Sequence, residues 1–394
     1  MTEVRERLEE LRDRGLYRHL RLVEGPQGPS VTLDGRSVLL LCSNNYLGLA
    51  DRAEVREAAA EAALRWGAGA GASRLISGTM EPHQALEQRL AAFKGYESAL
   101  LFGSGYLANS GVIAALAGRG EVVFSDELNH ASIVDGCRLS RAETFVYRHA
   151  DLDHLEWGLR QADGRASLIV TDGVFSMDGD VAPLAELLAL ARRHGARLMV
   201  DEAHATGAVG PGGRGSVSAA GLSGEVDVVV GTLGKALGSY GAYVCADAEL
   251  VDFLVNSARS FIFSTAPPPS AAAAASAALG VLEAEPELVE SLQANAALLR
   301  RSLGAEGLDA GASTTQVVPV HVGEAEATMD LCELSLEKGV FAQGIRPPTV
   351  AEGSCRLRLT AMATHRPADM VAAAHMIGVA AREAGIVVAE PLAA

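Results

Sequence analysis

The feature that most constrains the fold is a series of short, continuously apolar runs, each followed by glycine or polar residues. Helix-like segments lie between several of these runs, at residues 82–94, 107–117 and 183–194. The runs that we interpret as strands are residues 99–102, 121–124, 167–171, 197–200, 226–230 and 242–246. Apolar strands that alternate with helices are typical of a mostly parallel sheet with helices on both faces. The sequence therefore predicts an α/β fold.

The ends of the chain follow other patterns. Residues 1–20 are rich in Arg and Glu, and Val4, Leu8 and Leu11 would form one stripe of a charged, exposed helix. Asp34-Gly35 then predicts a turn between two short strands.

Beyond the alternating region, a long helical segment is expected from residue 270 to about residue 303. It leads to a region with strands of its own, at residues 316–321 and 355–360. We therefore expect an N-terminal arm (1–43), a large domain (44–284) and a small α+β C-terminal domain (285–394).

Composition excludes several classes of protein. A chain of 394 residues with 49% hydrophobic residues can form a large core and a second domain. Its formal net charge of -16 argues against a nucleic-acid-binding protein, which normally presents a basic face. No CxxC pair occurs, so neither a disulfide framework nor a zinc or other metal site is expected. No signal peptide or apolar membrane span is evident, so a cytoplasmic protein is expected.

Groups that can do chemistry follow the apolar runs. In an open parallel sheet, ligands bind outside the carboxyl ends of the strands. The groups placed there are Gly105-Tyr106, His130, Ser176, Asp201, His204, Thr232 and Lys235. We expect them to meet at one edge of the sheet.

Each of these residues also has an ordinary structural interpretation. Asp201 could cap a helix, and His130 or His204 could be a hydrogen-bonded core histidine. A lysine after a strand is usually a solvated surface residue. Lys235, however, is the sole charged residue from Val228 to Tyr243, and such surroundings lower the pKa of an amine, as Schiff-base chemistry requires. Their joint placement favours a site.

Pyridoxal 5'-phosphate requires this set of groups. Lys235 can form a Schiff base with its aldehyde, and Asp201 can pair with the pyridine nitrogen so that the ring acts as an electron sink. His204 can contact the phenolic oxygen, and His130 can stack on the ring. A helix that begins near Gly105-Tyr106 can receive the phosphate. The sequence thus predicts this cofactor.

Other interpretations explain less of the pattern. Residues 103–108 match the dinucleotide-binding GxGxxG/A pattern, but that pattern leaves Lys235 without a role. Residues 201–204 spell the helicase tetrad DEAH, yet no GxxxxGK[ST] occurs in the chain. A non-catalytic cofactor-binding or scaffold protein stays open, and an absorbance spectrum would separate it from an enzyme.

Four motifs resemble the α-oxoamine synthases, which are fold-type-I pyridoxal-phosphate transferases. They are residues 43–49 (SNNYLGL), 129–132 (NHAS), 172–179 (DGVFSMDG) and 231–235 (GTLGK). The resemblance extends from about Arg18 to the last helix. It implies a decarboxylative condensation of an amino acid with an acyl-CoA or acyl-carrier-protein thioester, and a homodimer with shared active sites.

The resemblance also implies roles for individual residues. It makes Lys235 the Schiff-base lysine, Asp201 the partner of the pyridine nitrogen, His204 that of the phenolic oxygen, and His130 the stacking group. Near the cofactor it places Ser176, Thr232 and the amides of Gly105-Tyr106, with Ser264 or Thr265 reaching the phosphate of the neighbouring subunit. Arg358 would hold the amino-acid carboxylate. The residues expected to line the acyl side and to make the remaining substrate contacts are Arg18, Asn44, Arg346 and Thr349.

Within the family the chain combines two patterns. Residues 344–350 (GIRPPTV) and 355–360 (CRLRLT) resemble members that join L-alanine to a pimeloyl thioester. Residues 78–83 (GTMEPH) and 232–238 (TLGKALG) resemble members that join glycine to acetyl-CoA. We therefore expect the alanine and pimeloyl pair, with the glycine reaction or a broad specificity as the alternative.

Overall fold

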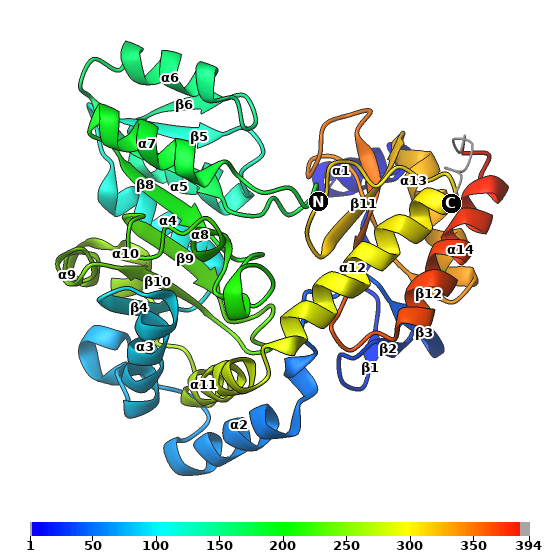
Figure 1. Cartoon of the computed structure of the whole chain (residues 1–394), viewed down its shortest axis with the longest axis horizontal. Helices are drawn as coiled ribbons and strands as arrows, with labels where there is room; N and C mark the ends of the chain where they lie inside the picture. Colours follow the sequence, from blue (N-terminus) through cyan, green and yellow to red (C-terminus); the bar gives the residue numbers. More distant parts are fainter. Residues whose placement is uncertain (1, 387–394) are drawn as a thin grey trace. The chain divides into compact units, whose positions relative to one another are not determined.

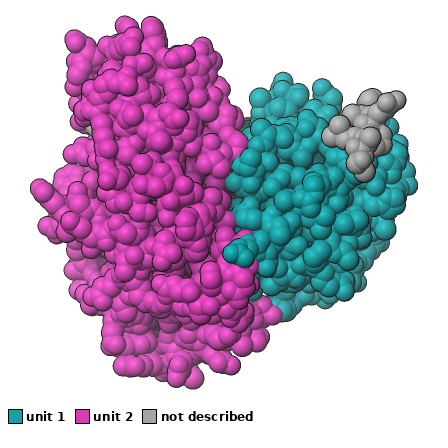
Figure 2. All heavy atoms as spheres, viewed as in Figure 1, with its two compact units in different colours: residues 1–48, 177–179, 290–394 teal, residues 49–176, 180–289 magenta. Residues whose placement is uncertain are grey.

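The computed structural model describes residues 2–386, and the chain divides into two compact units (Figure 2). Unit 1 comprises Met1–Gly48, Met177–Gly179 and Glu290–Ala394, and unit 2 comprises Leu49–Ser176 and Asp180–Val289. The expected arm and the expected C-terminal domain thus fall mainly in one unit. The reason is strand pairing, because residues 39–40 pair in parallel with residues 340–341.

Unit 2 is built on a seven-stranded sheet of order β4-β10-β9-β8-β7-β5-β6 (Figure 1). Its strands are β4 (Ser98–Phe102), β5 (Val122–Asp126), β6 (Glu143–Tyr147), β7 (Ala166–Asp172), β8 (Arg197–Asp201), β9 (Val228–Thr232) and β10 (Ala242–Ala246). Its helices are α2 (Ala53–Trp66), α3 (Glu81–Lys94), α4 (Gly105–Leu116), α5 (Ala131–Ser140), α6 (Leu152–Gln161), α7 (Leu184–His194), α8 (Ser216–Ala219), α9 (Ala248–Ser257), α10 (Arg259–Ile262) and α11 (Pro269–Ala284). Strands β5 to β9 pair in parallel, and β10 is antiparallel to both of its neighbours. The predicted mostly parallel sheet is confirmed.

The sequence failed to predict β6. This strand lies at the edge of the sheet, and only Tyr147 among its five residues is buried. An edge strand with one solvated face lacks the continuous apolar run by which the other strands were found.

Helices cover both faces of the unit 2 sheet. Helices α4, α5, α9 and α10 pack on one face, where Val170, Met199 and Val230 belong to their common core. Helices α3 and α7 contact strands on the other side, with α6 against β6. Side chains alternate along a strand, so residues two positions further on lie on the same face as these core residues. Asp172, Asp201 and Thr232 therefore end their strands on the α4–α5 face.

Unit 1 contains two small sheets, of order β1-β2-β3-β12 and β11-β14-β13. Its strands are β1 (Val23–Glu24), β2 (Ser30–Leu33), β3 (Arg36–Leu40), β11 (Val317–Gly323), β12 (Val340–Phe341), β13 (Gln343–Ile345) and β14 (Cys355–Thr360). Its helices are α1 (Thr2–Asp13), α13 (Ala325–Glu337) and α14 (Pro367–Glu383), and α12 (Glu287–Ala305) enters it from unit 2. Asp34 and Gly35 both have positive φ, at 49° and 79°, as the predicted tight hairpin turn requires.

Two sequence-based expectations about helices need correction. The single helix expected over residues 270–303 is wrong, because α11 ends at Ala284 and α12 begins at Glu287. Pro286 lies at the break, where its missing N–H cannot continue the helical ladder. The charged helix expected over residues 1–20 ends earlier, since α1 ends at Asp13, while its stripe of Val4, Leu8 and Leu11 is exposed as expected. Among residues 2–386, no helix combines the length and the apolar character needed to cross a bilayer.

Candidate active site

Lys235 and His204 are in direct contact in unit 2. Lys235 Nζ lies 2.7 Å from His204 Nε2, and both residues follow neighbouring strands of the sheet, β9 and β8. The turn after Lys235 closes at Gly238, whose N–H donates to the Lys235 carbonyl at 2.9 Å. Gly238 has a φ of +59°, and a Cβ there would lie 2.4 Å from the backbone nitrogen of Ala50. Glycine thus allows the lysine loop to pack against backbone.

Asp201 ends β8 as a buried carboxylate with two donors. The Asn109 side-chain amide donates to its Oδ2 at 2.6 Å, and the Ala203 N–H donates to its Oδ1 at 2.8 Å. Both oxygens of this carboxylate are therefore held by donors at the end of the strand, where Asp201 is 4% exposed.

His130 caps helix α5 and keeps its ring accessible. Its Nδ1 lies 2.7 Å from Ser132 Oγ, and the Ser132 N–H donates to the same nitrogen at 3.3 Å. Desolvation by the surrounding protein lowers the pKa of His130, Asp201 opposes this shift, and Lys235 adds to it. The residue is exposed although its polar edge is anchored. A neutral imidazole with an open face is suited to stacking on an aromatic ring.

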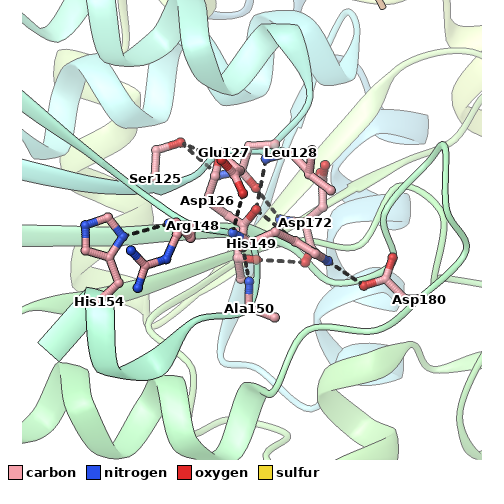
Figure 3. A network of polar contacts seen from close by, with 12 residues as sticks. Ser125, Asp126, Glu127, Leu128, Arg148, His149, Ala150, His154, Asp172 and Asp180 are labelled. Atoms are coloured by element: carbon pink, nitrogen blue, oxygen red, sulfur yellow. Dashed lines mark hydrogen bonds and ion pairs between the residues drawn. The ribbon is translucent and has the colours of Figure 1, made fainter. Parts of the chain in front are cut away.

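Asp172 anchors the backbone of His130 from the adjacent strand. Its Oδ2 accepts the His130 N–H at 3.0 Å, and its own N–H donates to Asn129 Oδ1 at 2.8 Å. Asp172 pairs with Asp201 across β7 and β8, and burial together with Asp201 raises its pKa well above the ordinary value. Figure 3 shows Asp172 beside a polar network in which His149 lies between Asp126 and Asp180.

Other expected cofactor contacts lie on the loops of unit 2. Ser104 caps α4 by accepting the Leu107 N–H, so the first turn of this helix begins at Gly105 and Tyr106. The Tyr106 hydroxyl donates to Asp135 on α5. Thr232 Oγ1 donates to the Gly241 carbonyl at 3.1 Å.

The remaining predicted cofactor contacts follow β7 and α10. Ser176 is half-buried in the loop after β7, and Ser264 and Thr265 follow α10, where Thr265 forms an isolated bridge with Ser73. These placements leave their cofactor roles as predictions.

Two predicted substrate residues, Arg358 and Asn44, come together in unit 1. Arg358 lies on β14, is 7% exposed, and has Nη2 at 3.4 Å from both Asn44 Oδ1 and the Tyr46 hydroxyl. Arg356, two residues earlier and therefore on the same face, pairs with Asp178. Arg358 thus hydrogen-bonds to two neutral groups, whereas Arg356 pairs with a carboxylate.

Three further predicted substrate residues cluster around the Arg346–Thr349 segment. Arg346 is buried and donates from Nη2 to the Tyr17 carbonyl at 2.6 Å, while Arg18 donates to the Pro347 carbonyl at 3.3 Å. Thr349 is exposed, and its N–H donates to the Arg346 carbonyl. Burial and the charge of Arg18 lower the pKa of Arg346. Arg346 anchors the backbone beside Arg18, and Arg18 itself is the exposed cation.

Sequence reasoning missed several polar residues that hold the site. Asn109, Ser132 and Asn129 received no role. The first two bond to Asp201 and His130, and Asn129 accepts the N–H of Asp172, which in turn accepts the His130 N–H. One signal was present for Asn109, which interrupts the otherwise apolar and small residues of α4. Contacts between α4, α5 and strand ends depend on tertiary packing, which a residue pattern does not contain.

Comparisons with known proteins agree with this geometry. The chain matches the family described as aminotransferase class I and II over residues 36–377. A relative from Citrifermentans bemidjiense, named 8-amino-7-oxononanoate synthase, is 55% identical over 98% of this chain and 100% of its own.

Solved structures give the same result. A serine palmitoyltransferase from S. paucimobilis with bound PLP-myriocin aldimine superposes with a TM-score of 0.93 at 34% identity, covering 98% of both chains. An 8-amino-7-oxononanoate synthase from Francisella tularensis gives a TM-score of 0.77 at 27% identity, over 89% of this chain and 99% of the other. The chain belongs to the aminotransferase class I and II family and, within it, to the α-oxoamine synthases.

Proposed function

We propose that the chain catalyses the pyridoxal-phosphate-dependent condensation of L-alanine with a pimeloyl thioester. The products are 8-amino-7-oxononanoate, carbon dioxide and the free thiol, in biotin biosynthesis. One observation carries this proposal. Relatives that bear the name 8-amino-7-oxononanoate synthase are 48–57% identical to the chain and cover 96–98% of it.

The residues of unit 2 fit pyridoxal phosphate. The amine of Lys235 suits its aldehyde, and the imidazole beside that amine suits its phenol. The doubly hydrogen-bonded carboxylate suits the ring nitrogen, and the accessible imidazole ring suits the ring face. The N-terminus of α4 suits the phosphate. When bound, the cofactor supplies an electron sink that stabilises negative charge at the Cα of the amino acid.

The protein groups then have defined tasks. Lys235 would hold the cofactor covalently, and its Nζ, once free, would remove the Cα proton of the amino acid and later return a proton. Asp201 would keep the ring nitrogen protonated, and His204 would contact the phenolic oxygen. His130 would stack on the ring.

Other residues would bind the phosphate and the substrate. The amides of Gly105 and Tyr106 would bind the phosphate, with Ser176, Thr232 and Ser264 or Thr265, one of the last two from the neighbouring subunit of a dimer. Arg358 would bind the amino-acid carboxylate, helped by Asn44, because a guanidinium matches a carboxylate with two parallel hydrogen bonds. Arg18, as the exposed cation, would meet the distal pimeloyl carboxylate, while Arg346 and Thr349 would shape its surroundings.

A second candidate is condensation of another amino acid with another acyl chain. The high structural similarity to serine palmitoyltransferase and the segments around Gly78 and Leu237 favour testing it. The single methyl that separates alanine from glycine is worth only about 1–3 kcal/mol in a pocket, so some glycine turnover is expected.

The deciding experiment is an activity matrix with product mass. Alanine, glycine and serine are each combined with pimeloyl, acetyl and palmitoyl thioesters, the pimeloyl chain on both coenzyme A and a carrier protein. We expect the highest kcat/KM for alanine with the pimeloyl chain. A clear preference for glycine with acetyl-CoA, or for serine with palmitoyl-CoA, would overturn the substrate assignment. The cytoplasmic location stays a prediction.

A further inference from the structure

A continuous hydrogen-bonded chain joins His130 to Asp201 through two side chains without an assigned role. Asn109 on α4 and Ser132 on α5 are each 1% exposed. The Asn109 Nδ2 lies 2.6 Å from Asp201 Oδ2 and 2.9 Å from Ser132 Oγ. Ser132 Oγ in turn lies 2.7 Å from His130 Nδ1. The group expected on the ring face and the group expected at the ring nitrogen are thus connected within the protein.

The chemistry of the four groups fixes the direction of each hydrogen bond. Asp201 as a carboxylate can only accept, so the nitrogen of the Asn109 amide must face it, and its two N–H groups donate to Asp201 and to Ser132. The Ser132 hydroxyl, which already accepts, has one proton to give to His130 Nδ1. The Ser132 N–H donates to the same nitrogen. Because Nδ1 accepts twice, the His130 ring is neutral and carries its proton on Nε2.

We propose that Asn109 and Ser132 are positioning residues that orient the Asp201 carboxylate and hold His130 as the neutral Nε2–H tautomer. The inference rests on the proposed function, in which these two groups serve the cofactor. A neutral His130 avoids a second positive charge beside the protonated ring nitrogen. The direction of these hydrogen bonds also leaves the Nε2–H of His130 as a donor on the side of the ring away from Ser132.

The local packing is built for this contact rather than for stability alone. Helices α4 and α5 approach closely at Gly136, where a Cβ would lie 2.9 Å from Ile113 Cδ1 and 3.1 Å from the Asn109 carbonyl oxygen. In the described part of the chain, Asn109 Oδ1 is buried without a hydrogen-bond partner. An unpaired buried acceptor lowers folding stability by about 1–3 kcal/mol. The two hydrogen bonds that the Asn109 amide donates explain why an asparagine is present despite this loss.

The test measures the tautomer of His130 in the cofactor-loaded enzyme without substrate. Imidazole ¹⁵N chemical shifts are recorded with labelled histidine, and the His130 signals are assigned by their loss in His130→Gln. We expect the Nε2–H pattern in the wild type, a mixture with the Nδ1–H form in Ser132→Ala, and a return to the wild-type pattern in Ser132→Thr. We expect kcat to fall about tenfold or more in Ser132→Ala, as for the loss of one hydrogen bond in a charged network.

Ser140→Ala is the matched control, because Ser140 is also buried on α5 but bonds within its own turn, to the Cys137 carbonyl. It should change neither the ring shifts nor kcat. An Nδ1–H tautomer in the wild type, or unchanged shifts in Ser132→Ala, would overturn the inference. Asn109→Leu should disturb both His130 and cofactor binding, and if it does not fold, Ser132→Ala decides alone. Since the ¹⁵N shifts are recorded without substrate, a wrong acyl assignment leaves the tautomer outcomes unaffected and alters only the kcat comparison.

Discussion

His149 is expected to stabilise unit 2 as a cation at neutral pH, and this stabilisation should disappear at high pH. Its Nδ1 lies 3.0 Å from Asp126 Oδ1 and its Nε2 lies 2.8 Å from Asp180 Oδ2 (Figure 3). Both ring nitrogens face carboxylates, so both must donate, which requires the imidazolium form. Hydrogen bonds to Asp126 and then Asp180 raise the pKa of His149 from 6.5 to about 10, against desolvation.

The size of the effect follows from linkage. A rise from 6.5 to about 10 corresponds to at most about 5 kcal/mol of folding free energy. Charged hydrogen bonds removed by mutation usually cost about 1.5–3 kcal/mol, so His149→Gln should cost about 2–4 kcal/mol. Because the folded pKa is raised, the contribution is complete below pH 6.5 and is lost as pH rises towards 10. The loss of stability in His149→Gln should therefore shrink over this interval.

The assay is the difference in thermal unfolding midpoint between wild type and variant at steps from pH 6 to pH 10. His154→Gln is the control at each pH, since the His154 Nδ1 accepts a backbone N–H from Arg148 and does not face a carboxylate. A wild-type minus His149→Gln difference that stays constant from pH 6.5 to pH 10 would refute the reasoning. Asp180→Asn should lower the measured pKa of His149, because it removes one of the two acceptors.

Three further substitutions test the proposed site. Lys235→Ala should abolish turnover and the visible absorbance of the bound cofactor, and a borohydride-reducible covalent adduct in this variant would contradict the assignment. Asp201→Asn should still bind cofactor but lose most of its kcat, because the amide cannot stabilise a protonated ring nitrogen, a charged hydrogen bond worth roughly 1.5–3 kcal/mol; wild-type kcat would rule that role out. Arg358→Ala should raise the KM for alanine about tenfold or more and leave that for the thioester nearly unchanged, with the reverse split placing Arg358 on the acyl side.

The parts of the fold that could be predicted are those in which burial on both faces leaves a direct mark on the sequence. Strands such as β8 and β9 contain an uninterrupted run of three buried apolar residues, and a polar residue shortly after this run ends each strand. β6 could not be found in this way, since at the sheet edge its residues face solvent. The break at Pro286 was readable, but the alanine-rich run before it suggested one continuous helix.

The site was predictable to a similar extent and for the same reason. Lys235, His204 and Asp201 follow strand ends, and parallel strand ends meet at one edge, so their proximity follows from the pattern. The hydrogen-bond partners of these residues come from helices, as Asn109 does from α4, and local sequence does not predict how helices pack. Arg346 illustrates the limit, because the sequence pattern did not show that its guanidinium donates to the Tyr17 carbonyl, and its role at the substrate stays a prediction.

The turn that carries Asp201 and His204 is held from both faces of the sheet. Asp201 points to the α4 face, and Glu202, the next residue, points to the other, where Lys94 of α3 pairs with it. The Glu202 carboxylate also accepts the Ser216 hydroxyl at 2.9 Å, and its side chain is fully buried. A buried ion pair of this kind adds little net stability compared with apolar packing, although losing one partner costs about 3–5 kcal/mol. Its value is therefore geometric: Asn109 holds the Asp201 side chain on one face of the sheet and Lys94 holds the Glu202 side chain on the other, so the turn that leads to His204 is fixed from both faces.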